Sequence, residues 1–334
     1  MSKIAILGSG SWGTALSYTF SKKNDVTLWS YLDSETEDLL KYSENKLFLP
    51  GVILPKSIKF TSDIKKAVMG AELIIFAVPS FAVRITAHKI ADVFEIKNQI
   101  AVCVSKGMEE STFMTLSEVI SDELPDNAVV CALSGPTHAE EVSRDIPTTI
   151  VAACEDITFA ERVQDICMND FFRIYTTTDI KGVELGGTIK NVIALCAGIS
   201  DGIGYGDNTK AALMTRGMFE IARLGLAMGG KYETFYGLSG MGDLIVTCTS
   251  MHSRNRRAGI LIGQGMSADD ALSSVRMVVE GVKCLKAVKN AAEKYNVEMP
   301  IINEAYRIIY EKEDPKRSVT NLMKRMKKTE HEGL

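Results

Sequence analysis

Residues 4–16 read Ile4-Ala5-Ile6-Leu7-Gly8-Ser9-Gly10-Ser11-Trp12-Gly13-Thr14-Ala15-Leu16. The apolar run predicts a buried strand, and the residues after the last glycine predict a helix. Gly8 permits the tight turn between them, Gly10 lets phosphate groups approach the backbone, and Gly13 lets the helix pack against the strand. The unpaired N–H groups and the positive dipole end of that helix attract an anion. The stretch therefore predicts a site for the pyrophosphate of a dinucleotide.

The composition is that of an ordinary globular protein with room for two domains, because 334 residues are 46% hydrophobic and 24% charged. The formal net charge of −4 argues against a general nucleic-acid binder. The N-terminus lacks the pattern of a signal peptide. Since we find no run of the ~18 apolar residues that a spanning helix needs, we expect a cytoplasmic protein without stable membrane insertion.

Cysteine and histidine usage gives little support to a metal site. The seven cysteines form no close pairs, and the four histidines form no His-x-x-x-His pattern. We expect most of the cysteines to be small core residues that stay reduced. No metal is predicted.

Strand-like runs alternate with helical patterns through the first half of the chain, as in a parallel, doubly wound sheet. The five clearest strands are Lys3–Leu7, Val26–Trp29, Leu73–Val78, Ile100–Val104 and Val129–Leu133. Two further runs, Thr149–Ala153 and Phe171–Tyr175, extend the sheet in a direction that the sequence leaves open.

From about Lys181 the pattern changes to long helices. The predicted helices are Val183–Ala197, Thr209–Met228, Ser253–Gln264, Val279–Tyr295 and Ile301–Tyr310, and Ser267 with Asp270 indicates a further helix start. The predicted fold is thus α/β, with an N-terminal Rossmann-like sheet domain over residues 1–180 and an all-helical domain over residues 181–334.

The residues that follow the predicted strands matter most, because ligands of open parallel sheets lie beyond the carboxyl ends of the strands. Lys106 follows one strand beside a glycine and could meet an anionic or carbonyl substrate, although a loop lysine is more often simply solvated. Gly135 and Thr137 follow another strand and could donate backbone and hydroxyl hydrogen bonds, or could cap the next helix.

The end of the second strand is where a dinucleotide-binding sheet selects its cofactor, with an acid for the ribose diol or an arginine for a 2′-phosphate. Here the chain has Ser30-Tyr31-Leu32-Asp33. Ser30 carries no charge to repel a 2′-phosphate, and Asp33 lies several residues beyond the strand end at which an acid would select NAD. The sequence therefore leaves NAD and NADP as alternatives.

In the helical half, Lys190 and Asn191 lie in an apolar helix that also contains Gly186 and Gly187. Close backbone packing is the simplest reason for two helix-weakening glycines. The two polar residues are about 100° apart on the helix, so both could reach one wall of a cleft. Alternatively, the lysine extends its ammonium into water. As a proton acceptor, Lys190 would need a pKa lowered from about 10.4 by burial or by a cation such as Lys106.

Two later stretches add polar groups. Asp243 could orient Lys190, and Thr247 lies one helical turn further on the same face. Ser253 can cap the next helix and place Arg254 and Asn255 in its first turn, which would suit a phosphate group. The alternative is a solvated basic surface.

Taken together, these motifs resemble bacterial-type NAD(P)-dependent glycerol-3-phosphate dehydrogenase over essentially the whole chain. The resemblance rests on Gly8-Ser9-Gly10-Ser11-Trp12-Gly13, Val78-Pro79-Ser80, Lys106-Gly107, Ser134-Gly135-Pro136-Thr137, Gly186-Gly187-Thr188-Ile189-Lys190-Asn191, Gly242-Asp243-Leu244 and Ser253-Arg254-Asn255-Arg256. It implies reversible interconversion of sn-glycerol 3-phosphate and dihydroxyacetone phosphate, with a nicotinamide dinucleotide as cofactor and phospholipid synthesis as the destination of the product.

The resemblance also implies roles for individual residues. Lys190 matches the proton acceptor, while Asn191 and Thr247 match polar positions of the site. In the mechanism that this implies, Lys106 and Asn191 stabilise the developing charge, so the expected catalytic residues are Lys190, Lys106, Asn191 and Asp243. The implied substrate contacts are Lys106, Gly135, Thr137, Lys190, Asp243, Thr247, Ser253, Arg254 and Asn255. The implied cofactor contacts are Ser11, Trp12, Lys106, Ala139, Arg254, Val278 and Glu280. Ser30 and Tyr31 are expected to join them because they follow the second strand. The departure is Ser30-Tyr31, where the family often has arginine or histidine. Many relatives are dimers, so a homodimer is compatible with the resemblance.

Two other functions compete with this one. A 3-hydroxyacid dehydrogenase also joins a dinucleotide-binding sheet to a helical domain with a catalytic lysine, and it would accept a carboxylate in place of the phosphate. A non-catalytic NAD(H) sensor would bind cofactor without oxidising it when the ketone is added.

Overall fold

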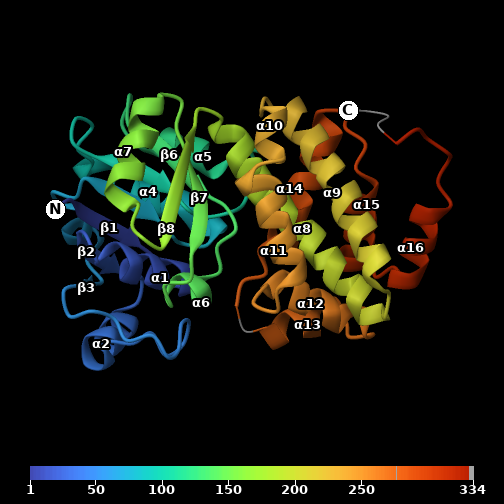
Figure 1. Cartoon of the computed structure of the whole chain (residues 1–334), viewed down its shortest axis with the longest axis horizontal. Coiled ribbons are helices and arrows are strands. Elements are labelled where there is room, and N and C mark those ends of the chain that lie inside the picture. The colour runs from blue at the N-terminus through green and yellow to red at the C-terminus, as the bar shows by residue number, and fades with distance from the viewer. Residues whose placement is uncertain (276, 331–334) are drawn as a thin grey trace. The chain divides into compact units, whose positions relative to one another are not determined.

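The computed structural model describes residues 1–275 and 277–330, and they fold into two compact units (Figure 1). The first unit comprises Met1–Ser105 and Leu116–Ile180. The second comprises Lys106–Thr115 and the chain from Lys181 onward. This division differs from the predicted one at one point, because the ten residues from Lys106 leave the sheet unit and join the helical one.

Within the described residues of the first unit, eight strands form one sheet in the order β3-β2-β1-β4-β5-β6-β7-β8. The strands are β1 (Lys3–Leu7), β2 (Asp25–Trp29), β3 (Lys59–Thr61), β4 (Leu73–Phe76), β5 (Ile100–Cys103), β6 (Val129–Ser134), β7 (Thr148–Ala153) and β8 (Phe172–Thr177). All neighbours are parallel except β6 and β7. The predicted doubly wound sheet is confirmed.

The apolar runs of the central strands reflect burial on both faces, since every residue of β4 and β5 is buried. Helices connect the strands in sequence. They are α1 (Ser11–Phe20), α2 (Asp33–Tyr42), α3 (Ile64–Val68), α4 (Val83–His88), α5 (Leu116–Glu123), α6 (Ala139–Val142) and α7 (Ile157–Cys167).

The order of the strands locates the crevice of the sheet. From β1 the chain winds outward through β2 to β3, and it then returns to place β4 on the other side of β1. Ligands of doubly wound sheets bind at this reversal, outside the carboxyl ends of the strands. The turn from Gly8 to Gly13, which follows β1, stands at this point.

The second unit is helical, as predicted. Its helices are α8 (Ile180–Ile203), α9 (Asp207–Ala227), α10 (Tyr232–Phe235), α11 (Asp243–Thr249), α12 (Arg254–Gly263), α13 (Ala268–Val275), α14 (Glu280–Lys294), α15 (Pro300–Tyr310) and α16 (Pro315–Met323), with a short π-helical turn at Leu238–Gly242. The predicted start at Ser267 is confirmed, because its hydroxyl accepts a hydrogen bond from the Asp270 amide at 3.2 Å.

Helix α8 is the centre of this unit. By length and composition it could cross a membrane, but 94% of its most apolar window is buried inside the protein. Its apolar side chains Leu185, Ile189 and Ile193 belong to the helical core. We therefore interpret α8 as a core helix.

Glycines set the spacing between α8 and α12. A Cβ on Gly198 would stand 2.0 Å from the Arg256 carbonyl oxygen, and one on Gly259 would stand 2.1 Å from the Leu195 oxygen. The two backbones therefore touch directly. The same explanation holds for Gly186, where a Cβ would lie 3.1 Å from the Ser239 oxygen, as predicted. The direct backbone contact between α8 and α12 fixes the start of α12 relative to Lys190 and Asn191.

Candidate active site

The turn after β1, which we call the glycine turn (Gly8–Gly13), has the features that a pyrophosphate requires. Gly8 has φ +117°, and a Cβ there would lie 2.9 Å from the Ala77 backbone. A Cβ on Gly13 would lie 1.9 Å from the Gly8 oxygen, whereas one on Gly10 would meet nothing within 4 Å. Gly10 is also the N-cap of α1, so no side chain occupies the first N–H groups of that helix. Ser11 and Trp12 open α1 and are half-buried.

Other predicted residues of the first unit lie after β6. Thr137 donates its hydroxyl to the Gly135 carbonyl at 3.1 Å, which closes a local turn. Ala139 is buried at the first position of α6. Gly135 packs closely on β7, since a Cβ there would lie 3.1 Å from the Ile150 Cα.

The two residues after β2 differ sharply in exposure. Ser30 is fully buried, and its hydroxyl has no hydrogen-bond partner within the described part of the chain. Tyr31 is 69% exposed. The side chain of Ser30 therefore faces the interior, while the side chain of Tyr31 lies largely at the surface.

Four predicted residues of the second unit form one hydrogen-bonded group, which we call the lysine cluster (Lys106, Lys190, Asp243, Thr247). The Lys190 Nζ donates to Asp243 Oδ1 at 2.7 Å and to Thr247 Oγ1 at 2.5 Å. The Lys106 Nζ donates to the other carboxylate oxygen, Asp243 Oδ2, at 2.6 Å. Thr247 donates to the Asp243 carbonyl at 2.6 Å, one turn apart on α11.

Three segments of the unit supply the lysine cluster, and α11 contributes both Asp243 and Thr247. Lys190 lies on α8, and Asp243 begins α11. Lys106 belongs to this unit because Thr188 donates its hydroxyl to the Gly107 carbonyl at 3.1 Å, and Met108 joins the helical core. Two cations thus share one buried carboxylate.

Burial and the neighbouring charges together set the pKa values in the lysine cluster. Burial and, to a smaller extent, the nearby Lys106 ammonium lower the pKa of Lys190, Asp243 opposes both, and the net result is a pKa of about 8. For Asp243, burial favours the neutral acid, but the two ammonium groups outweigh it and hold the pKa of the carboxyl below its usual range. The cluster therefore contains an amine that can change protonation near neutral pH.

The two predicted asparagines form a second network. Asn255 donates from Nδ2 to Asn191 Oδ1 at 2.9 Å, and its Oδ1 accepts from the Gly281 amide at 2.9 Å. Asn191 also donates to the Gly187 carbonyl at 3.3 Å. This network connects α8 to the first turns of α12 and α14. The side chains of Asn191 and Asn255 therefore position these helices relative to one another.

The residues that were predicted to bind a phosphate group lie at the start of α12. Ser253 is its N-cap and accepts a hydrogen bond from the Arg256 amide at 3.2 Å. Arg254 is the first residue of the helix and is half-buried, so a cation stands beside the N–H groups of a ten-residue helix. Val278 and Glu280, both half-buried, lie just before and at the start of α14.

Three residues that are hydrogen-bonded to these groups were not predicted from the sequence. Gly281 takes part in the asparagine network, and Glu35 and Asn45 are hydrogen-bonded to the glycine turn. The signal for Glu35 was its place about 20 residues after the last glycine, where an acid often stands. Among the described residues, no group of three or more His, Cys, Asp or Glu side chains is placed to hold a metal ion.

Comparisons with known proteins match nearly the whole chain to one family. Residues 3–160 match the family model described as NAD-dependent glycerol-3-phosphate dehydrogenase N-terminus, and residues 179–320 match the model of its C-terminus. Two relatives, from Agathobacter rectalis and Clostridium acetobutylicum, are named glycerol-3-phosphate dehydrogenase [NAD(P)+]. Each is 52% identical; the first alignment covers 100% of this chain and 99% of the relative, and the second 99% of both.

A solved structure gives the same result. The crystal structure of glycerol-3-phosphate dehydrogenase from Coxiella burnetii superposes with a TM-score of 0.93 at 36% identity, covering 97% of this chain and 99% of that one. The similarity therefore extends over both units.

Proposed function

Because the chain belongs to the NAD-dependent glycerol-3-phosphate dehydrogenase family, we propose that it interconverts sn-glycerol 3-phosphate and dihydroxyacetone phosphate with Lys190 as the proton carrier. The enzyme is an NAD(P)-dependent oxidoreductase. The observation that carries the role of Lys190 is its placement in the lysine cluster, where burial lowers its pKa to about 8.

The chemistry follows from the donors of the lysine cluster. Two N–H groups of the Lys190 ammonium donate to Asp243 and Thr247, which leaves the third for the oxygen on C2 of the substrate. When bound, a reduced nicotinamide would supply the hydride to C2. Lys190 gives the proton to the oxygen as the carbonyl becomes a hydroxyl, and it takes the proton back in the reverse direction.

Lys106 supports this step by its charge. Its ammonium shares Asp243 with Lys190, which supports a role in which it would stabilise negative charge that develops on the carbonyl oxygen. Asn191 acts through its hydrogen bond to Asn255. Asn191 therefore holds the first turn of α12 in place and does not itself exchange protons.

The phosphate of the substrate is assigned to the start of α12. Arg254, the capping Ser253 and the N–H groups of the first turn together favour a dianion. Asn255 contributes through its remaining amide hydrogen. Binding energy from the phosphate, remote from C2, would then fix the reactive geometry.

The cofactor is assigned to the glycine turn and the adjoining strand ends. The open space at Gly10 and the free start of α1 fit a pyrophosphate. Ser11, Trp12, Tyr31 and the backbone of Ser30 would contact it from the first unit. Ala139, Arg254, Val278 and Glu280 are assigned as further contacts.

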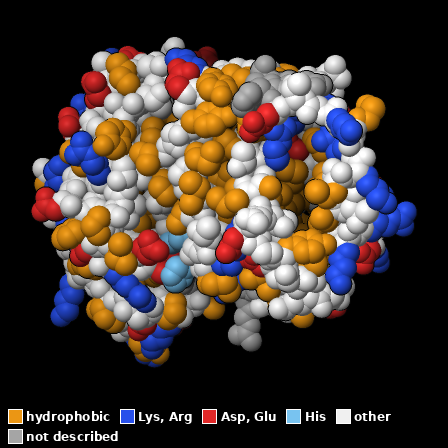
Figure 2. All heavy atoms as spheres, turned by 45° about the vertical axis from the view of Figure 1, so that its right-hand side comes forward, with side chains coloured by type: hydrophobic (Ala, Val, Ile, Leu, Met, Phe, Trp, Pro, Cys, Tyr) orange, Lys and Arg blue, Asp and Glu red, His pale blue; other side chains and the backbone are white. Residues whose placement is uncertain are grey.

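The wider role is also part of the proposal. The product, glycerol 3-phosphate, would supply phospholipid synthesis in the cytoplasm, and a homodimer stays a prediction. Figure 2 shows Lys and Arg side chains interspersed with acidic and apolar ones on the face drawn, in keeping with the net charge of −4 and a small-molecule substrate.

One assay tests the proposal. Purified protein is mixed with NADH or NADPH and dihydroxyacetone phosphate, and the absorbance of the reduced cofactor is followed. Oxidation that depends on the phosphorylated ketone supports the proposal. Oxidation only with a keto acid, or cofactor binding without oxidation, would overturn it in favour of a hydroxyacid dehydrogenase or a cofactor sensor.

A further inference from the structure

The glycine turn is hydrogen-bonded to a carboxylate. Ser9, which lies between Gly8 and Gly10, donates its hydroxyl to Glu35 Oε2 at 3.0 Å. Glu35 is in the first turn of α2, directly after β2 and its connecting residues. Ser9 is buried and Glu35 is half-buried. The carboxylate is thus held at the turn by its own hydrogen bond.

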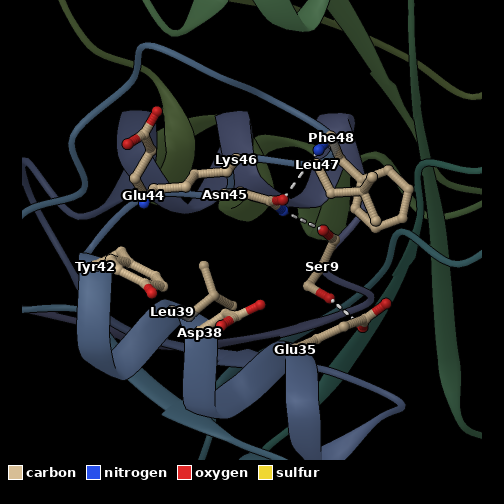
Figure 3. Close-up of a pocket in the computed structure, with 10 residues that line it drawn as sticks. All are labelled: Ser9, Glu35, Asp38, Leu39, Tyr42, Glu44, Asn45, Lys46, Leu47 and Phe48. Atoms are coloured by element: carbon tan, nitrogen blue, oxygen red, sulfur yellow. Dashed lines mark hydrogen bonds between the residues drawn. The ribbon is translucent and has the colours of Figure 1, made fainter.

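Both residues line a cavity of about 120 Å³ beside the turn. Figure 3 shows Ser9 and Glu35 on one side of it, with Asn45 above them. Asn45 donates from Nδ2 to the Ser9 carbonyl at 2.6 Å and to Thr14 Oγ1 at 2.9 Å, and its Oδ1 accepts from the Phe48 amide at 3.0 Å. The wall formed by residues 45–48 is therefore fixed to the glycine turn.

The charge that lines the cavity is mainly negative. Besides Glu35, the acidic residues Asp38 and Glu44 line it, and Glu44 Oε1 accepts a hydrogen bond from the Gly51 amide at 2.8 Å. The lysine in the lining, Lys46, lies with its Nζ 3.4 Å from the centre of the Tyr42 ring. A phosphate dianion would be repelled here, whereas the hydroxyl groups of a sugar would find acceptors.

The end of β2 adds a second argument. In dinucleotide-binding sheets an acid near this point accepts hydrogen bonds from the adenosine ribose, and an arginine here accommodates a 2′-phosphate. Ser30 cannot serve either purpose with its buried side chain, and Tyr31 is uncharged. The charged group that remains to distinguish NAD from NADP is therefore the Glu35 carboxylate, which is hydrogen-bonded to Ser9 of the glycine turn.

We propose that Glu35, held by Ser9, accepts hydrogen bonds from the adenosine ribose hydroxyls and makes the enzyme prefer NAD(H) to NADP(H). This inference rests on the proposed dehydrogenase function and adds the choice of cofactor. A competing cation is Lys89, whose Nζ lies 4.9 Å from the centre of the Tyr31 ring. If Lys89 bound a 2′-phosphate, the preference would be the opposite.

The test measures binding of two nucleotides that lack nicotinamide, by calorimetric titration of the full chain. Wild-type protein should bind 5′-ADP about tenfold or more tightly than 2′,5′-ADP, as expected for a hydrogen bond to a charged group. Glu35→Gln should remove most of that ratio, and Ser9→Ala should reduce it. Glu37→Gln changes an exposed carboxylate on the same helix and should leave the ratio unchanged.

Three results would overturn the ribose assignment: a ratio unaffected by Glu35→Gln, a wild-type preference for 2′,5′-ADP that Lys89→Ala abolishes, or no binding of either nucleotide. Thermal unfolding of each variant identifies any that has lost its fold, and Ser9→Ala then supplies the second test. Steady-state KM values for NADH and NADPH should follow the same ratio. If 5′-ADP binds in a Glu35-dependent way but the ketone causes no NADH oxidation, the dehydrogenase proposal fails and the ribose subsite stands.

Discussion

Lys190 and Asp243 form a buried ion pair in which the Nζ and Oδ1 atoms are 2.7 Å apart and both side chains are at most 6% exposed. The pair comes from helices that are far apart in the sequence, and Lys106 binds the opposite oxygen of the same carboxylate. A buried pair of this kind usually costs desolvation energy, so a functional reason for it is expected.

Lys190→Met should lower kcat by about 100- to 10,000-fold, the usual contribution of a general acid or base. Cofactor affinity should be nearly unchanged, because the glycine turn belongs to the other unit. Stopped-flow kinetics and NADH titration measure the two quantities. Lys283→Met, at an exposed position of α14, is the matched control. A kcat within a few-fold of wild type would remove Lys190 from the chemistry.

The pH dependence should report the lowered pKa of Lys190. Ketone reduction needs the ammonium form, so kcat/KM for dihydroxyacetone phosphate should fall as pH rises through about 8. Oxidation of glycerol 3-phosphate needs the free amine and should rise through the same range. Asp243→Asn removes the carboxylate that opposes burial, so both limbs should move about one unit or more toward lower pH. Limbs that stay in place would contradict the assignment, and Asp156→Asn in the other unit is the control.

Arg254→Ala should mainly raise KM for dihydroxyacetone phosphate, by roughly 10- to 150-fold, because it removes a charged donor from the phosphate. Arg257 is exposed on the same helix, so Arg257→Ala tests whether any basic residue there would have the same effect. Initial rates at varied substrate concentration give both constants. An unchanged KM would exclude Arg254 from phosphate binding.

Gly281→Ala should impair substrate binding as well as stability. The new Cβ would stand 2.5 Å from the backbone carbonyl oxygen of Asn191 and 3.0 Å from Asn255 Oδ1. Helix α14 must therefore shift, and the hydrogen bond from the residue 281 amide to Asn255 is lost. We expect about 1–3 kcal/mol of destabilisation and a raised KM for the phosphorylated ketone. Gly206→Ala is the control, because a Cβ there meets nothing within 4 Å. Destabilisation with an unaltered KM would show that the network is only structural.

Glu220 should make stability depend on pH. Its carboxylate accepts from the amides of Ile301 and Ile302 at the start of α15, at 2.8 and 3.2 Å. Burial raises its pKa from 4.5 to about 7 against those bonds. The folded state therefore holds a proton that the unfolded chain releases between these values, and the free energy of unfolding should fall as pH rises through them.

Glu220→Gln removes this titration. Relative to wild type, the free energy of unfolding of the variant should rise by about 3 kcal/mol between pH 4.5 and pH 8. Urea denaturation at several pH values measures it, with the exposed Glu161→Gln as control. Parallel curves for wild type and variant would contradict the assignment.

Most of the sheet could be predicted because its central strands are short apolar runs with clear ends. β3 was missed, since its three residues Lys59–Thr61 are half-exposed or exposed and show no apolar pattern. The direction of β7 was left open because hydrophobicity indicates burial and not orientation, and the structure shows it antiparallel to β6.

The site was predictable by residue type but less so by arrangement. Lys106 follows a strand of the sheet, so its sequence position indicated the sheet domain, yet Gly107 and Met108 attach it to the helices. Ser30 is a polar residue at a strand end, where exposure is the usual expectation, but it is buried. The bonds Ser9–Glu35 and Asn255–Gly281 join residues 26 positions apart, a pairing that local patterns do not encode.

The direct backbone contact between α8 and α12 has a consequence for substrate binding. Where Gly198 and Gly259 meet the opposite helix there are no side-chain rotamers to order, so the spacing of the two helices is established during folding. The interval from Lys190 to Arg254 is then a fixed length of the ligand-free enzyme. With Lys190 at the carbonyl and Arg254 at the phosphate, as we propose, a substrate would have to match that length in its own covalent skeleton. The spacing of the two helices would then select substrates by the distance between their carbonyl and phosphate groups.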